Sequence, residues 1–227
     1  MLTRLASISL VFAASLCVVA EEPLIRFQKK QLDARFRSEG VAVGNFNKDG
    51  EMDVAARFVW YESPKWNMHL ITSKPPSGGA AIIQDEQDET KSLQFQPKGY
   101  SNSFANFAVD VNSDGWTDLI VVDFPGKPTW WYENPKGESG NWRKHLCTPV
   151  TNNESPDLLD LDGDGERELI AAFSPDPAQP NGPDRQMAFI TPDADPYKAW
   201  HPHPVSAKGA PGCERYSHGL GTGDVNG

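Results

Sequence analysis

Four short acidic segments recur along the chain and follow one pattern. Side chains that carry oxygen stand at positions 1, 3, 5 and 9 of each complete segment, and glycine stands at position 6. The segments begin at residues 45, 110, 160 and 224, and the sequence ends within the fourth. Oxygen atoms two residues apart converge on one point only when the backbone turns tightly, and glycine permits that turn. The pattern therefore predicts loops that wrap a hard cation, Ca2+ above all.

The predicted ligands are the side chains at these positions and the backbone carbonyl at position 7. In chain order they are Asn45, Asn47, Asp49, Glu51, Asp53, Asp110, Asn112, Asp114, Trp116, Asp118, Asp160, Asp162, Asp164, Glu166, Glu168, Asp224 and Asn226. Acidic side chains at positions 1, 3, 5 and 9 number two, three and four in the first three loops. Because ligand charge tunes such sites, calcium affinity is expected to rise in that order. The alternative is a turn that binds no ion, since Asn, Asp and Gly favour turns in any case.

The sequence around the loops argues against a helix–loop–helix calcium site. An EF-hand requires a bidentate acid at position 12 and a helix on each side. Position 12 is occupied here by Ala56, Val121 and Ala171. Short apolar runs follow the loops, as at 119–122 and 169–173, and such runs are typical of buried strands. Each loop is therefore predicted to join two strands of a hairpin, where its ion would be structural.

Two further motifs repeat in phase with the acidic loops. Trp-Tyr-Glu-(Ser/Asn)-Pro occurs at 60–64 and 131–135. Trp-x-x-His follows at 66–69, 142–145 and 200–203. Each repeat thus reads as a strand, an acidic loop, a second strand, an aromatic strand and a strand that begins with Trp-x-x-His. Four antiparallel strands per repeat are typical of a β-propeller blade, so these tryptophans and histidines are expected to serve packing and edge hydrogen bonds.

The predicted fold is all-β, an incomplete arc of about three propeller blades plus the first strand of a fourth. The blades are expected at roughly 41–72, 104–148 and 155–206, the next one starting at 217–227. Residues 27–33 are predicted to be the closing strand of the last blade. Propellers have about 4–8 blades, so the chain is expected to be a fragment of a longer protein.

The N-terminus predicts export. Arg4 is the only charged residue before Glu21, and residues 5–19 are apolar, so residues 1–20 are predicted to be a signal peptide and residues 21–227 the mature chain. The mature protein is expected to be secreted, periplasmic or at the cell surface, with no membrane span. In such an oxidising compartment Cys147 and Cys213 could pair or stay free. A formal charge of −10 disfavours nucleic acid as a partner.

Candidate ligand-binding residues stand six and seven positions before the loops, where inner strands begin at the mouth of a propeller channel. The predicted ligand face consists of Glu39, Ser103, Glu154, Ser217 and His218. Polar groups around a funnel are suited to a carbohydrate or an extracellular protein. The alternative is that they cap strand starts and are merely solvated. No nucleophile elbow, zinc helix motif or phosphate loop occurs in the sequence, so an enzyme activity lacks a mechanism.

The acidic loops, together with the Trp-Tyr-Glu-Asn-Pro and Trp-x-x-His elements, resemble the FG-GAP/VCBS repeat family, whose propeller repeats also occur in integrin α-subunits. The resemblance implies calcium in the hairpin loops and commonly seven blades, but no single activity. A weaker similarity to the propeller domain of aldos-2-ulose dehydratases raises a sugar-modifying lyase or hydrolase as an alternative. Three functions therefore stay open: a calcium-binding interaction module, an enzyme with a site at the channel mouth, and a structural surface repeat.

Overall fold

The computed structural model describes residues 25–72 and 100–224. The chain divides into two compact units, Met1–Gln31 and Leu32–Gly227. In the first unit the described residues, 25–31, form no helix or strand. The predicted signal peptide lies outside the described residues. The described part of the chain contains no helix long and apolar enough to cross a membrane.

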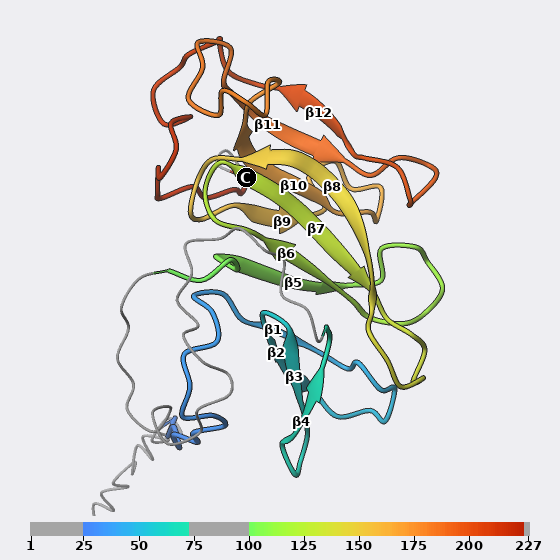
Figure 1. Cartoon of the computed structure of the whole chain (residues 1–227). Coiled ribbons are helices and arrows are strands. Elements are labelled where there is room, and N and C mark those ends of the chain that lie inside the picture. Colours follow the sequence, from blue (N-terminus) through green and yellow to red (C-terminus); the bar gives the residue numbers. More distant parts are fainter. Residues whose placement is uncertain (1–24, 73–99, 225–227) are drawn as a thin grey trace, which may run out of the picture. The chain divides into compact units, whose positions relative to one another are not determined.

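The described part of the second unit contains three four-stranded antiparallel sheets, each formed by consecutive strands (Figure 1). Blade 1 consists of β1 (Ala42–Gly44), β2 (Asp53–Ala56), β3 (Val59–Glu62) and β4 (Asn67–Leu70). Blade 2 consists of β5 (Ala105–Val109), β6 (Asp118–Val122), β7 (Lys127–Glu133) and β8 (Arg143–Thr151). Blade 3 consists of β9 (Asp157–Leu159), β10 (Glu168–Phe173), β11 (Gln186–Thr191) and β12 (His201–Pro204). This arrangement confirms the predicted all-β fold of propeller-type blades.

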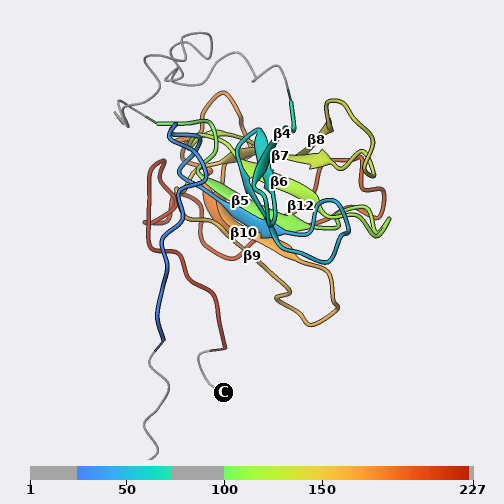
Figure 2. The same ribbon diagram turned by 90° about the horizontal axis from the view of Figure 1, so that it is seen from below.

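Blade 2 lies between the other two blades, because β1 contacts β5 and β8 contacts β10 (Figures 1 and 2). Its strand β6 is buried along its whole length. Successive side chains of a strand point to opposite faces, and β6 uses both faces. Leu119 and Val121 join an apolar cluster with blade 1, whereas Ile120 and Val122 join a cluster with blade 3. A strand buried on both faces has to be apolar throughout, which explains the run after Asp118.

Two of the three tryptophans that precede the fourth strands, Trp142 and Trp200, pack between blades. Trp142 lies in the cluster with blade 1, and its backbone N–H donates to the carbonyl of Ile71 at 2.9 Å. Trp200 lies in the cluster shared by blades 2 and 3, and its N–H donates to the carbonyl of Cys147 at 2.8 Å. The predicted packing role of these two tryptophans is therefore confirmed.

The histidine three residues later stays within its own sheet. Its ring packs against the aromatic residue directly across the strand pair in each blade, with ring centroids 4.3–4.8 Å apart: His69 on Trp60, His145 on Trp131 and His203 on Phe189. Its Nε2 lies 2.9–3.0 Å from a side-chain oxygen of the third strand, on Glu62, Glu133 and Thr191 respectively. These histidines therefore stabilise the outer strand pair of each blade.

Residues 27–33, predicted to be the closing strand of the last blade, and 217–227, predicted to start the next blade, are not strands in their described parts, 27–33 and 217–224. A strand requires a hydrogen-bonded neighbour, and both were expected to pair within blades that the described residues do not contain. Residues 217–224 nevertheless lie beside the start of blade 3. The N–H of Glu154 donates to the carbonyl of Ser217 at 2.9 Å, much as the N–H of Gly40 donates to the carbonyl of Ser103 at 3.1 Å between blades 1 and 2.

Cys147 and Cys213 are both free and buried, so of the two alternatives the structure contains the unpaired one. Cys147 belongs to the apolar cluster between blades 2 and 3. Burial there raises the pKa of its thiol well above the ordinary value. A thiol held neutral in this way is a packing group rather than a reactive one.

Candidate metal loops

The three complete acidic segments form hairpin loops of one geometry. Loop 1 (residues 45–53) joins β1 to β2, loop 2 (110–118) joins β5 to β6, and loop 3 (160–168) joins β9 to β10. In every loop the amide of position 5 donates to the side chain of position 3, at 3.1–3.2 Å. The amide of position 7 donates to the side chain of position 5, at 2.8–2.9 Å. These bonds hold the backbone in the tight turn that the spacing of the oxygens predicted.

Two positions of each loop have left-handed backbone conformations. The glycine at position 6 has φ of 93°, 83° and 94° in loops 1, 2 and 3. Position 4 is also left-handed, and it is occupied by Lys48, Ser113 and Gly163, with φ of 61°, 57° and 83°. The requirement at position 4 was not predicted, and Gly163 was its only signal in the sequence. Because glycine alone adopts this region without steric cost, loop 3, with glycine at both positions, is the least strained loop.

The acid at position 9 is buried in all three loops. Its carboxylate accepts a hydrogen bond from the amide of position 2, at 2.9 Å for Asp53, 3.0 Å for Asp118 and 2.8 Å for Glu168. Burial, together with the negative charges of Asp114 and Asp110, raises the pKa of Asp118 to about 7. The pKa of Glu168 is raised by burial as well, with added repulsion from the other acids of loop 3. A cation in either loop would relieve this repulsion.

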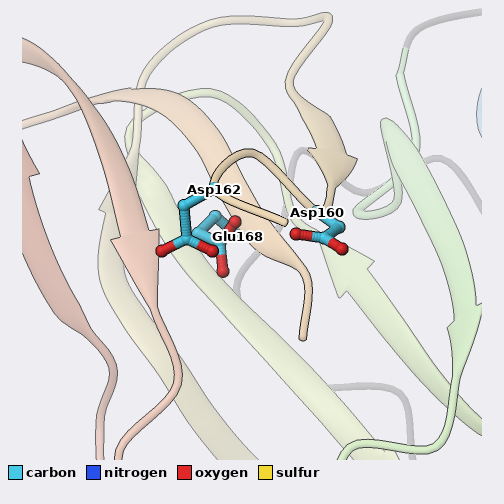
Figure 3. Close-up of side chains that lie close together, drawn as sticks. All are labelled: Asp160, Asp162 and Glu168. Atoms are coloured by element: carbon cyan, nitrogen blue, oxygen red, sulfur yellow. The ribbon is translucent and has the colours of Figure 1, made fainter. Parts of the chain in front are cut away.

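Loop 3 brings three carboxylates together. Oxygen atoms of Asp160, Asp162 and Glu168 all lie within 4.8 Å of one another. Figure 3 shows these three side chains at the hairpin. Asp160 and Asp162 are exposed, whereas Glu168 is buried beneath them. Asp164 lies outside this group. Hard oxygen ligands from one short loop are the donor set that Ca2+ takes, so these residues fit the ion that was predicted.

Loops 1 and 2 differ from loop 3 in what surrounds their oxygens. In loop 1 the Oδ1 of Asn45 is buried and accepts no hydrogen bond within the described residues, so it is free to serve as a ligand. In loop 2 the Nζ of Lys136 lies 3.1 Å from the Oδ2 of Asp114. Lys48 of loop 1 also reaches loop 2, with its Nζ 4.5 Å from the centre of the Trp116 ring. Neither lysine was predicted to belong to the site.

The residues predicted to form a ligand face lie in two groups. Glu39 accepts hydrogen bonds from the amide and hydroxyl of Ser101, while Ser103 is fully buried and donates to the Oδ1 of Asn106 at 2.6 Å. In the second group, Glu154 lies 3.2 Å from the exposed imidazole of His218, and Ser217 donates to the carbonyl of Glu214 at 2.9 Å. Burial removes Ser103 from direct contact with a ligand in this structure, because its neighbours pack over the strand start.

A cavity that the sequence did not indicate lies between loops 2 and 3. Its volume is about 320 Å3, and its walls include Asp110, Asn112, Glu166 and Trp200. The Nε1 of Trp200 is buried and has no hydrogen-bond partner within the described residues. The cavity could not be predicted because its walls come from two different blades and from the turn before β12. Of the two ligands predicted in the fourth acidic segment, Asp224 is described, whereas Asn226 lies outside the described residues.

Residues 110–171 match the family model of the FG-GAP-like repeat. This stretch begins at the first residue of loop 2 and ends within β10, so it includes both loop 2 and loop 3. The match confirms the resemblance that the acidic loops indicated for this part of the chain. No curated protein matches the chain. The weaker similarity to aldos-2-ulose dehydratases gains no support from these comparisons.

Proposed function

We propose that this protein, which contains an FG-GAP-like repeat, is an exported interaction module whose hairpin loops bind structural Ca2+. The observation that carries the proposal is loop 3, where three carboxylates from a single hairpin converge within 4.8 Å of one another. The shared hydrogen bonds of all three loops support the same role for loops 1 and 2. Asp160, Asp162 and Glu168 also accept hydrogen bonds from amides of the loop, and a cation would relieve the repulsion that remains between them.

In loop 3 the ion would be held by Asp160, Asp162 and Glu168, joined by Asp164 and the carbonyl of Glu166 as the spacing implies. When bound, Ca2+ supplies positive charge and oxygen coordination rather than reaction chemistry. Glu168 begins β10, which is buried along its length in the core between blades 2 and 3. Neutralising this carboxylate would therefore stabilise the hairpin where it enters the core.

The proposed partner is a carbohydrate or an extracellular protein. The acidic charge of the chain speaks against nucleic acid, and the second group of the ligand face offers the exposed His218 beside Glu154. The proposed export rests on the sequence of residues 1–20. No observation among the described residues favours the enzyme alternative over the interaction module.

Calcium is expected to raise the melting temperature of the full chain relative to the same protein in chelator. At a concentration one hundredfold above the dissociation constant, a site that exists only in the folded state adds about 2.7 kcal/mol. For a domain of this size that corresponds to about 5–10 °C. Differential scanning fluorimetry in excess Ca2+ and in EGTA measures the shift.

The matched variants separate the loop from general charge effects. Asp160→Asn with Asp162→Asn should lose most of the shift, whereas Asp184→Asn with Asp195→Asn, which removes the same charge at exposed positions outside the loops, should keep it. Identical melting curves in Ca2+ and EGTA for the unaltered chain would contradict the proposal.

A further inference from the structure

We infer that the ammonium group of Lys136 is the built-in counter-cation of loop 2, so that loop 2 binds Ca2+ more weakly than loop 3 by more than its smaller number of acids would dictate. This inference rests on the calcium-binding function proposed above. It assigns a role to a residue outside the nine positions of the loop. It also distinguishes two ways of neutralising the same kind of hairpin, one with a lysine and one with a metal ion.

Lys136 lies beside the carboxylate at position 5 of loop 2. Oδ1 of Asp114 already accepts the N–H of Trp116 at 2.9 Å, so Oδ2 is the less engaged oxygen that position 5 offers a cation. That oxygen is the one that lies 3.1 Å from the Nζ of Lys136. Lysine and Ca2+ would therefore compete for the same atom.

Lys136 belongs to a turn that hydrogen bonds anchor to loop 2. Lys136 lies just after β7, and its N–H donates to the Oδ1 of Asn134 at 3.0 Å. Asn134 is tied to loop 2 in turn. Its N–H donates to the Oδ1 of Asp118 at 2.8 Å, and its side-chain amide donates to the carbonyl of Thr117 at 2.8 Å. The backbone of Lys136 is thus anchored beside the loop, and its side chain, which is 53% exposed, reaches Asp114 from there.

The equivalent turns of blades 1 and 3 differ from the turn of blade 2 that contains Lys136. The turn after β11, residues 192–197, contains no lysine, and the next one, Lys198, lies 3.8 Å from Asp195 of the same turn. Among the described residues, none of the ion pairs joins a basic side chain to Asp160, Asp162 or Glu168, and these are the carboxylates that converge. In blade 1 the equivalent lysine, Lys65, forms no ion pair within the described part of the chain. Only blade 2 therefore combines the acidic loop with a lysine in contact.

The consequence is electrostatic. A divalent ion in loop 2 would face a positive charge a few ångströms away, or would have to displace it from Asp114. From Coulomb's law at solvent-like dielectric, with screening by salt, removing that charge should tighten Ca2+ binding by about tenfold. Loop 3 should not respond.

Trp116 provides a reporter for loop 2. It stands at position 7, where the backbone carbonyl rather than the side chain is the predicted ligand, so its indole can sensitise Tb3+ luminescence from an ion in that loop. Loop 3 contains no aromatic residue. Tb3+ is titrated into the full chain and then displaced with Ca2+. The part of the signal that Trp116→Phe removes is the part that reports on loop 2, because Trp200 lines the cavity beside Glu166 of loop 3.

With Lys136→Met, the concentration of Ca2+ that displaces half of the Tb3+ should fall by about tenfold. Lys136→Arg keeps the charge and should resemble the unaltered chain. Lys208→Met is the matched control, because Lys208 also forms an exposed ion pair, with Asp184 at 2.9 Å, but far along the chain from the loops. Lys136→Gln gives a second neutral variant, and circular dichroism checks that each variant is folded.

Equal midpoints for Lys136→Met, Lys136→Gln and the unaltered chain would overturn the inference. Failure of the proposed function is a different result. In that case Ca2+ would not raise the melting temperature of the unaltered chain, and Asp160→Asn with Asp162→Asn would change nothing. Intact loop 3 binding with an unresponsive loop 2 would therefore refute the role of Lys136 alone.

Discussion

Replacing Trp131 with alanine is expected to lower the free energy of unfolding by about 3–5 kcal/mol, which is the usual cost of truncating a large buried aromatic side chain. Trp131 has no exposed surface and lies in the apolar cluster between blades 2 and 3, with Leu169 and Trp200 among its members. The ring of His145 also packs against it, with ring centroids 4.4 Å apart. The substitution therefore opens a cavity where two blades meet. Urea denaturation in excess Ca2+ measures the loss.

The neighbouring residue on the same strand provides the control. Trp130 points to the opposite face of β7, is only partly buried, and has the Nζ of Lys144 3.6 Å from its ring centre. Trp130→Ala should therefore cost about 1–2 kcal/mol, as expected where the surrounding solvent can fill the space. Equal losses for the two variants would mean that blades 2 and 3 do not share the core described here.

Replacing Asn134 with alanine is expected to cost about 2–3 kcal/mol, because three hydrogen bonds of a buried side chain are lost at about 1 kcal/mol each. Its side-chain amide donates to the carbonyls of Phe46 and Thr117, both at 2.8 Å, and its Oδ1 accepts the N–H of Lys136 at 3.0 Å. Phe46 belongs to loop 1 and Thr117 to loop 2. Asn134 thus joins the loops of two adjacent blades.

The effect should be confined to those two loops, and hydrogen–deuterium exchange can show it. Amides of loops 1 and 2 should exchange faster in Asn134→Ala, while amides of loop 3 should exchange as before. Asn134→Ser is the matched variant, because Ser63 holds the equivalent place in blade 1 and donates its N–H to Asp53 at 2.9 Å. Uniformly faster exchange in all three loops would show that Asn134 acts on the whole fold rather than as a link between neighbours.

The hairpins and the four-stranded blades could be predicted because their signals are local. Alternating oxygen-bearing residues with glycine at position 6 specify a tight turn within nine residues, and apolar runs such as 119–122 specify a strand buried on both faces. The packing of Trp142 and Trp200 could also be predicted, since a large aromatic residue that recurs in register with the strands needs a core to occupy.

The features that could not be predicted depend on residues far apart in the chain. Lys136 reaches Asp114 across 22 positions, and the walls of the cavity between loops 2 and 3 come from two blades. The burial of Ser103 results from neighbours that the sequence does not place beside it. The left-handed conformation at position 4 was hidden because two of the three loops have a lysine or a serine there. Periodicity shows where a loop begins, but not which side chains fold back over it.

The most direct measurement of the central claim, that convergent carboxylates of loop 3 bind Ca2+, is isothermal titration of the full chain with Ca2+. The unaltered chain should show a binding event that disappears in Asp160→Asn with Asp162→Asn and persists in Asp184→Asn with Asp195→Asn. A chain that binds no Ca2+, or a loop 3 variant that binds it with unchanged stoichiometry and affinity, would contradict the claim.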